Sequence, residues 1–195
     1  MKKQSSVKEI LIPAIVLFLI AVVCTALLAL TNDVTKQKIA DIAVQTENEA
    51  KQAVLSDAAS FSEAKTVTVD GTEYQYFEGL DANGAVVGYV IPQTTKSYGG
   101  ALSLMVGISA ADDKITGVQI SEINDTPGLG MKAKGADFLN QFAGKTGELT
   151  VSKNASADNE IQAITSATIS SRAVTTAVNN AFAVYEQVKA GAENG

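Results

Sequence analysis

The stretch Ile164-Thr165-Ser166-Ala167-Thr168-Ile169-Ser170-Ser171 carries a hydroxyl group on five of its eight residues. The apolar residues after it recur at steps of three and four: Val174, Ala177, Val178, Ala181, Tyr185 and Val188. This spacing predicts a helix with one buried face. The hydroxyl cluster is therefore expected where that helix begins, and unpaired N–H groups there favour a phosphate. Taken alone, such residues are more often N-caps, worth about 1 kcal/mol each.

An apolar run, ILIPAIVLFLIAVVCTALLAL, occupies residues 10–30 and contains no charged side chain. Since roughly 20 helical residues cross a bilayer core of about 30 Å, the run predicts a transmembrane helix. Pro13 is expected in its first turn, where proline is tolerated. A cleaved signal peptide would have a shorter apolar core and a clearer cleavage site. Val23 before Cys24 matches a lipoprotein signal poorly, and a buried core helix is rarely apolar on every face for this length.

Charge is distributed unequally about this run. Lys2, Lys3 and Lys8 precede it, so the positive-inside tendency places residues 1–9 in the cytoplasm and the remainder across the membrane. All but three of the 15 basic residues and all but one of the 21 acidic residues lie beyond residue 9. So acidic a domain disfavours nucleic acid as a partner, although solubility explains most of the charge.

The chain has no histidine, and Cys24 in the apolar run is its one cysteine. These absences exclude a Ser-His-Asp triad, cysteine-ligated iron–sulfur and zinc sites, and disulfides within one chain. Any redox chemistry must therefore come from a cofactor held by hydroxyl groups, amides and backbone. Apart from Cys24, the predicted span has no ionisable residue with which to translocate an ion.

Residues 31–62 are expected to continue the membrane helix and then form a second helical stretch, a stalk or linker. From Lys65 onward, short β-branched and aromatic runs predict strands. Those strands are expected at residues 66–69, 74–77, 86–91, 102–108 and 115–120. Asp70-Gly71, residues 81–84 and residues 112–114 have turn composition and predict hairpins. No series of Ca²⁺ ligands follows Asp112 and Asp113, so both are interpreted as turn residues.

Two glycine-containing stretches interrupt this pattern. In Tyr98-Gly99-Gly100 the glycines permit close approach of a ligand or a second backbone, although a tight turn is an equally good interpretation. In residues 124–131, Pro127 and two glycines flank one leucine, which predicts a rigid loop presenting Leu129. No Gly-Lys-Ser/Thr sequence follows, so this is not a nucleotide phosphate loop.

A short helix at residues 136–142, strands at 149–151 and 161–164, and a frayed tail at 191–195 complete the prediction. The fold class is therefore α+β: an N-terminal transmembrane helix, then a domain over residues 63–190 with an antiparallel sheet and flanking helices.

Taken together, these motifs resemble RnfG, a component of the Rnf electron-transport complex, the ion-pumping ferredoxin:NAD⁺ oxidoreductase. A family related to it supplies a component of the Na⁺-translocating NADH:quinone reductase. The resemblance covers nearly the whole chain. It rests on the N-terminal span, Tyr98-Gly99-Gly100 with the strand after it, the loop Thr126-Pro127-Gly128-Leu129-Gly130, and Ala163-Ile164-Thr165-Ser166-Ala167-Thr168 with the following helix.

In that family, a flavin transferase joins FMN through a phosphoester bond to the Thr that closes a [Ser/Thr]-Gly-Ala-Thr motif. The resemblance implies that Thr168 is the attachment point here. It further implies a phosphate site shaped by Thr165, Ser166, Ala167 and Ser170. The implied flavin-bordering loop is Asp125, Thr126, Pro127, Gly128, Leu129 and Gly130, with Leu129 against the ring, and the implied second wall is Tyr98, Gly99 and Gly100.

The chain departs from the family pattern at four positions. Ser166 replaces the usual Gly, and we expect it to be tolerated if φ is negative there. Gln162 stands where the transferase motif has Asp, which puts recognition by the transferase in question. Asp125 replaces Glu, and Ile123 stands where His is often found, so any flavin contacts at these two positions differ from those of the family.

The function implied is an extracytoplasmic electron relay through covalent FMN, in a single-pass membrane protein that is not a complete enzyme alone. Its partners would be the other membrane and peripheral Rnf subunits and the flavin transferase. Two other functions remain open at this point. One is an FMN-carrying domain of another extracytoplasmic electron-transfer system; the other is a non-redox membrane-anchored binding or scaffold protein.

Overall fold

The computed structural model describes residues 3–193. It divides into two compact units, with the boundary between Glu47 and Asn48. Lys2, which belongs to the expected cytoplasmic segment, lies outside the described residues. The same is true of residues 194 and 195 in the expected tail.

Helix α1, Lys3–Val54, forms the first unit as far as Glu47, and its last turns, from Asn48, belong to the second unit. Within the segment Ile10–Lys36, an 18-residue window has a mean hydropathy of 3.0 and none of that window is buried, so the segment is long and apolar enough to cross a membrane. Pro13 lies inside the helix rather than in its first turn, because the helix already begins at Lys3. The two helical stretches expected after the span form one continuous helix that ends at Val54.

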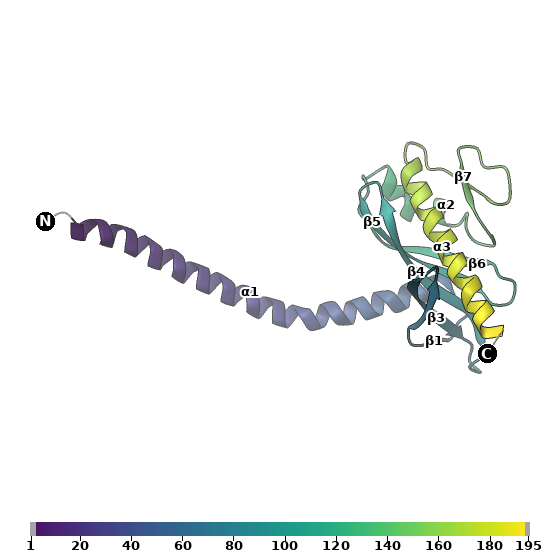
Figure 1. Ribbon diagram of the computed structural model, residues 1–195, viewed down its shortest axis with the longest axis horizontal. Helices are drawn as coiled ribbons and strands as arrows, with labels where there is room; N and C mark the ends of the chain where they lie inside the picture. The colour runs from purple at the N-terminus through teal and green to yellow at the C-terminus, as the bar shows by residue number, and fades with distance from the viewer. Residues whose placement is uncertain (1–2, 194–195) are drawn as a thin grey trace. The chain divides into compact units, whose positions relative to one another are not determined.

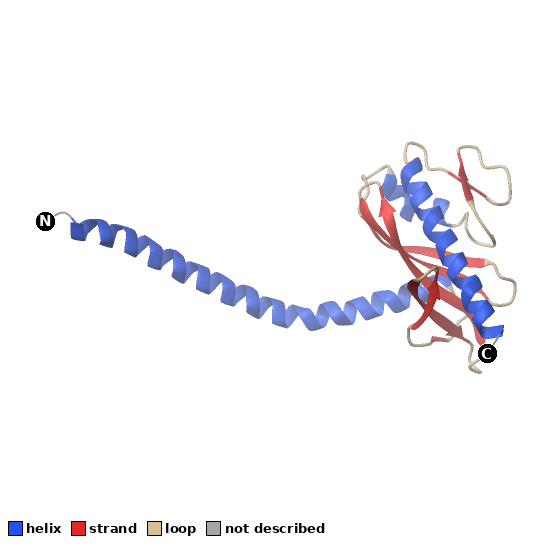
Figure 2. Ribbon diagram, in the orientation of Figure 1, coloured by secondary structure: helices blue, strands red, loops and turns tan. Residues whose placement is uncertain are grey.

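The second unit is built on a six-stranded antiparallel sheet with the order β1-β3-β4-β5-β6, in which β2 also pairs with β3 (Figure 2). Its strands are β1 Ser60–Phe61, β2 Lys65–Val69, β3 Thr72–Leu80, β4 Val86–Ser97, β5 Gly100–Ser109 and β6 Ile115–Ile123. The long β4–β5 hairpin pairs Ser97 with Gly100, so Tyr98 and Gly99 form its two-residue turn. The expected hairpins and the α+β class are confirmed.

The remaining elements follow the sheet in sequence. They are the 3₁₀ helix η1 Gly130–Lys134, α2 Ala136–Leu139, β7 Thr150–Ser152, β8 Glu160–Gln162 and α3 Thr168–Glu193. Helix α2 is shorter than expected, because the chain turns after Leu139. Strands β7 and β8 pair with each other in parallel, apart from the antiparallel sheet. Helix α3 extends through the start of the tail that was expected from residue 191.

Helix α3 lies across one face of the sheet (Figure 1). Its apolar residues predicted from periodicity are all buried: Val174, Ala177, Val178, Ala181, Tyr185 and Val188. They form one cluster with every second residue of β5, including Leu102, Leu104 and Val106. The buried face of the helix and the buried face of the strand therefore pack in one core. This packing fixes the start of α3 at the end of the sheet that carries the β4–β5 turn.

The opposite face of the sheet receives the last turns of α1. Ala50, Val54 and Leu55 are buried there in a second cluster. A Cβ on Gly107 would lie 2.2 Å from the Val54 carbonyl oxygen, so only glycine lets the helix end approach this strand. The Thr116 hydroxyl donates a hydrogen bond to the same carbonyl. The compact unit thus includes the end of the expected stalk.

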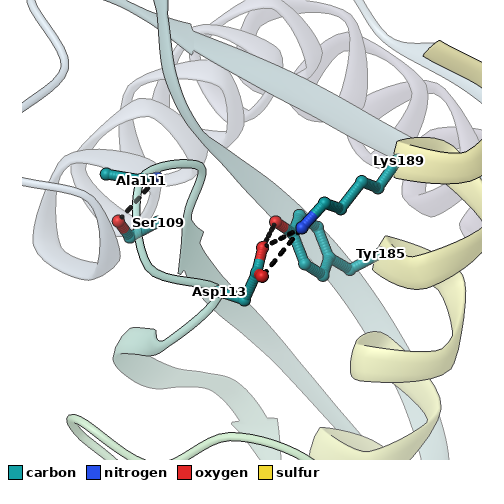
Figure 3. A network of polar contacts seen from close by, with 5 residues as sticks. All are labelled: Ser109, Ala111, Asp113, Tyr185 and Lys189. Carbon is teal, nitrogen blue, oxygen red and sulfur yellow. Dashed lines mark hydrogen bonds and ion pairs between the residues drawn. The ribbon is translucent and has the colours of Figure 1, made fainter. Parts of the chain in front are cut away.

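A polar cluster fastens the last turns of α3 to the β5–β6 turn (Figure 3). Asp113 accepts a hydrogen bond from the Tyr185 hydroxyl and is 2.7 Å from the Lys189 ammonium group. The hydrogen bond from Lys189, then that from Tyr185, lowers the pKa of Asp113 below its ordinary value. Burial, then the hydrogen bond to Asp113, raises the pKa of Tyr185.

Candidate functional site

The hydroxyl-rich segment before α3 forms a tight turn. The Ala167 N–H donates to the Ile164 carbonyl at 2.9 Å, which closes a four-residue turn. Its third residue, Ser166, has a φ of 63°. A positive φ at that position is the mark of a type II turn, which favours glycine. The negative φ on which we made the tolerance of Ser166 conditional is therefore not found, because the turn places this residue in the left-handed region.

The Ser171 side chain connects the first turn of α3 to the tight turn before it by two hydrogen bonds. The Ser171 hydroxyl accepts a hydrogen bond from the Ile164 N–H at 2.9 Å and donates to the Ala167 carbonyl at 3.0 Å. Ala167, which precedes the helix, carries a methyl group and cannot cap it with a side-chain acceptor. The N–H groups of the first turn, beginning at Thr168, therefore stay available to an outside acceptor.

A cavity of about 460 Å³ opens at this helix start. Ten residues from three separate segments line it: Tyr98, Asp125, Thr126, Leu129, Gly130, Ser166, Ala167, Thr168, Ile169 and Ser170. Thr168 is half-buried and is the first residue of α3. The structure therefore brings together the predicted attachment residue, most of the predicted loop and the predicted Tyr98 wall.

Exposed apolar side chains gather at this cavity. In the part of the second unit that the structure describes, four large apolar side chains are exposed: Val86, Tyr98, Leu129 and Ile169. Three of them line the cavity, with exposed fractions of 70% for Tyr98, 41% for Leu129 and 59% for Ile169. Such a concentration of exposed apolar side chains at one concave site is typical of a site that binds a small molecule or a cofactor.

Asp125 is a buried polar residue that lines the same cavity. Only 5% of this residue is exposed. Its carboxylate accepts hydrogen bonds from the Ser97 hydroxyl at 2.5 Å and from the Gly99 N–H at 2.6 Å. Burial alone would raise the pKa of Asp125, but hydrogen bonds from Ser170, Ser97 and Gly99 together lower it below its ordinary value. The side chain is therefore ionised at neutral pH.

Five of the predicted site residues are not among the lining residues. Gly99 is the second residue of the β4–β5 turn, Gly100 is the first residue of β5, and Pro127 and Gly128 lie in the loop before Leu129. Thr165 instead lines a neighbouring cavity together with Lys132, Gln141 and Gln162. As contacts to a cofactor, all of the predicted residues remain predictions.

Sequence reasoning missed two residues of this site. Ile169 was overlooked although it is an apolar residue that interrupts the hydroxyl cluster, which was a usable signal. Ser97 had no such signal, because its contact with Asp125 joins residues 28 positions apart. Two serines of the hydroxyl cluster, Ser170 and Ser171, are buried. Hydrogen bonding from Ser170 lowers the pKa of Asp125, and the Ser171 hydroxyl donates to the Ala167 carbonyl.

The cavity therefore has two chemically different parts. One part has a threonine hydroxyl and the positive end of a 26-residue helix, which suit an anion. The other has exposed aromatic and aliphatic side chains, which suit a flat apolar ring. Within residues 3–193, no three His, Cys, Asp or Glu side chains are grouped to hold a metal ion.

Comparison with known proteins gives matches to two family models. Residues 97–183 match the FMN-binding domain, and residues 1–55 match the RnfG N-terminal region. The first match includes every residue that lines the cavity.

Curated relatives match over almost the full chain. The RnfG protein of the Na⁺-translocating ferredoxin:NAD⁺ oxidoreductase complex of Acetobacterium woodii is 40% identical, with 96% of this chain and 97% of the relative covered. The corresponding protein of the ion-translocating oxidoreductase complex of Methanosarcina acetivorans is 33% identical, with 91% and 95% covered.

A solved structure supports the fold. The NqrC protein of the Na⁺-translocating NADH-quinone reductase of Parabacteroides distasonis superposes with a TM-score of 0.57 at 20% identity, covering 73% of this chain and 92% of that one. Fold, family models and full-length relatives agree, and the chain belongs to the RnfG family of ion-translocating ferredoxin:NAD⁺ oxidoreductase complexes, with an FMN-binding domain.

Proposed function

We propose that this chain carries FMN in the cavity at the start of α3, joined by a phosphoester bond to Thr168, and relays electrons within a membrane complex of the Rnf type. One observation carries the proposal: the half-buried Thr168 begins α3 in the same cavity that collects Tyr98, Leu129 and Ile169.

The polar part of the cavity fits the phosphate end of FMN. The N–H groups of the first turn of α3 and the exposed Ser166 are available donors beside Thr168. Ester formation removes the Thr168 hydroxyl proton and leaves a phosphate diester, whose single negative charge is favoured at a helix N-terminus. A covalent link also keeps the cofactor in place without a high affinity, which suits a domain outside the cytoplasm.

The apolar part fits the isoalloxazine ring. Aromatic and aliphatic side chains at a concave site exclude water from a flat ring and gain about 25 cal/mol for each Å² of apolar surface buried. Leu129 and Ile169 come from different segments, the loop after β6 and the first turn of α3. We therefore assign Leu129, Ile169 and Tyr98 as the side chains that contact the ring.

The attachment step needs an activated FMN, a phosphoanhydride supplied with the flavin transferase. The Thr168 oxygen forms the new bond to phosphorus, the anhydride P–O bond breaks, and the hydroxyl proton leaves to a base. The chain has no histidine, and the carboxylate that lines the cavity, Asp125, already accepts hydrogen bonds from three groups. The base therefore belongs to the transferase. The reaction adds FMN minus water to the chain, with no net oxidation.

Bound FMN supplies the redox chemistry, accepting and passing electrons between other cofactors. The chain's own residues bind and orient it and shield one part of it from water. No dinucleotide or cluster-binding motif is present in the sequence, so we place the NADH and ferredoxin sites on partner subunits. The names of the relatives support a complex of several subunits.

We further propose that the N-terminus is cytoplasmic and the second unit extracytoplasmic. The lysines before the span support this orientation. A cysteine introduced at the exposed Asp57, in a Cys24→Ser background, should react with a membrane-impermeant maleimide in spheroplasts. Protection until the membrane is lysed would reverse the assignment.

The attachment is tested by intact mass of the full chain made with a flavin transferase, together with flavin fluorescence after denaturation. We expect wild type to gain one FMN minus water and Thr168→Ala to gain nothing. Thr176→Ala is the matched control, because Thr176 is an exposed threonine two turns further along α3. An unmodified wild type would reject the covalent site and favour a non-redox binding role.

A further inference from the structure

The carboxylate of Asp125 is the point where three distant segments meet. Ser97 is the last residue of β4, Gly99 lies in the β4–β5 turn, and Ser170 lies in the first turn of α3. Ser97 and Gly99 donate hydrogen bonds to Asp125, which follows β6. The Ser170 hydroxyl and Asp125 Oδ2 both lie beside Gly130, and hydrogen bonding from Ser170 lowers the pKa of Asp125. The β4–β5 turn region therefore makes two hydrogen bonds to this buried side chain, and the start of α3 approaches the same side chain through Ser170.

The donors lie next to the residues that face the cavity. Tyr98 stands between Ser97 and Gly99, and Thr168 and Ile169 directly precede Ser170. A shift of Asp125 would therefore move the β4–β5 turn, which carries Tyr98, relative to the start of α3, which carries Thr168.

Gly130 makes this meeting sterically feasible. A Cβ on Gly130 would lie 2.5 Å from the Ser170 hydroxyl oxygen and 2.6 Å from Asp125 Oδ2. Both distances are far below ordinary van der Waals contact. The final glycine of the loop is thus needed so that the serine and the carboxylate can meet.

The charge of Asp125 argues against direct contact with a phosphate. An ionised carboxylate repels a phosphate and has no proton to donate to it. Its lone pairs are used by two hydroxyl groups and one amide, and it is almost wholly buried. Its contribution to the site is therefore mechanical, through the groups that it holds.

We propose that Asp125 is a positioning residue that fixes the β4–β5 turn and the first turn of α3 as opposite walls of one site, with Gly130 as the gap that permits it. This inference rests on the proposed function for its consequence, which is correct presentation of the Thr168 hydroxyl to the flavin transferase. The way Asp125 holds the two walls in place, which we call bracing, is a property of the unmodified chain and is measured separately.

The first measurement is amide hydrogen exchange of the unmodified full chain in detergent. Asp125→Asn should speed exchange at residues 97–100 and at residues 168–171 together, because the amide keeps only one uncharged acceptor oxygen for the donors of both walls. The matched control is Asp112→Asn, a half-exposed carboxylate in the β5–β6 turn. Faster exchange confined to the loop around residue 125, with both walls unchanged, would overturn the proposal.

The second measurement is the rate of FMN transfer to the full chain, with the chain treated as the substrate. Asp125→Asn should lower kcat at least tenfold while KM for the chain changes less than twofold, because misplacing a reacting group by about 1 Å can cost up to a hundredfold. A wild-type rate would overturn the proposal, whereas a rise in KM alone would indicate a lost transferase contact and would equally overturn it.

Ser97 variants keep the test decisive if Asp125→Asn folds poorly. Ser97→Ala removes one donor and should lower kcat several-fold, while Ser97→Thr keeps the hydroxyl and should restore most of it. Equal rates for the two variants would reject the bracing role. If wild type itself receives no FMN, the proposed function fails, and the exchange measurement still decides whether Asp125 braces the cavity.

Discussion

Helix α3 is held at each end by an aspartate from a neighbouring loop, and the two contacts differ in kind. At its start, Asp125 is 5% exposed and accepts only from neutral groups, including Ser97 and Ser170. At its end, the side chain of Asp113 is 40% exposed and is paired with the Lys189 cation. The first contact adjoins the candidate cofactor cavity, and the second adjoins the surface.

The difference shows how burial changes what an aspartate contributes to stability and to geometry. A buried carboxylate must be fully hydrogen-bonded, and its donors become costly to leave unpaired. An exposed ion pair exchanges its partners for water and contributes little. The buried contact therefore controls geometry at the site, while the exposed one secures a helix end.

The largest expected effect is at the buried contact. Asp125→Asn should lower the free energy of unfolding by about 2 kcal/mol, because an amide NH₂ replaces one acceptor oxygen and leaves a buried hydroxyl unpaired. Chemical denaturation of the full chain in detergent measures this. A loss smaller than that of Asp113→Asn would invert the comparison.

A second prediction concerns backbone strain near the two ends. Ser166 has a φ of 63° and Asp113 a φ of 57°, but aspartate tolerates the left-handed region better than serine does. Ser166→Gly should raise the free energy of unfolding by about 0.5 kcal/mol, because relief of about 1 kcal/mol of strain is partly offset by the flexibility of glycine.

Asp113→Gly is the matched change, because it relieves φ but removes the contact with Lys189 and Tyr185. It should give no stabilisation. Thermal unfolding of both variants checks the sign. A destabilised Ser166→Gly would mean that the serine side chain makes a contact worth more than the strain.

The exposed contact should give a smaller effect that depends on salt. Asp113→Asn should lower the free energy of unfolding by about 0.5 kcal/mol at low ionic strength, and by less at about 1 M salt, where the Debye length is about 3 Å. The effect of Asp125→Asn should not change with salt, since its partners are uncharged. Denaturation at two salt concentrations separates the two cases, and equal salt dependence would contradict the assignment.

The smallest expected effect is on the pH dependence of stability. Both aspartates have a folded pKa below the unfolded value of about 3.9, so their contributions are complete above that value and are lost as pH falls through the folded pKa. Asp81, Asp112 and Glu160 act in the same direction. Each Asp→Asn variant should therefore lose less stability than wild type between about pH 5 and strongly acidic pH, and a steeper loss would contradict the sign.

The sequence alone predicted the parts whose signal is local or periodic. The apolar run of residues 10–30 indicated a membrane span, and the spacing from Val174 to Val188 indicated the buried face of α3. Turn residues such as Asp70-Gly71 marked the hairpins. Physical periodicities of about 2 and 3.6 residues are visible in the chain itself, so no tertiary information was needed.

Details at element ends were predicted less well. Pro13 was placed in a first turn, because the start of α1 at Lys3 carries no capping signal. The sign of φ at Ser166 was left open, since a serine does not itself indicate the type II turn in which it lies.

Only the tertiary structure decided which hydroxyls face the cavity. Ser166, Thr168 and Ser170 line it, whereas the Ser171 hydroxyl donates to the Ala167 carbonyl and Ser171 does not line the cavity. The choice depends on Ser97 and Asp125, which are 28 residues apart and meet only because β4, β6 and α3 have these ends at the same side of the sheet. The sequence by itself determined that a hydroxyl cluster begins the last helix. Long-range packing determined its geometry, because a hydrogen bond between distant segments leaves no periodic trace in the chain.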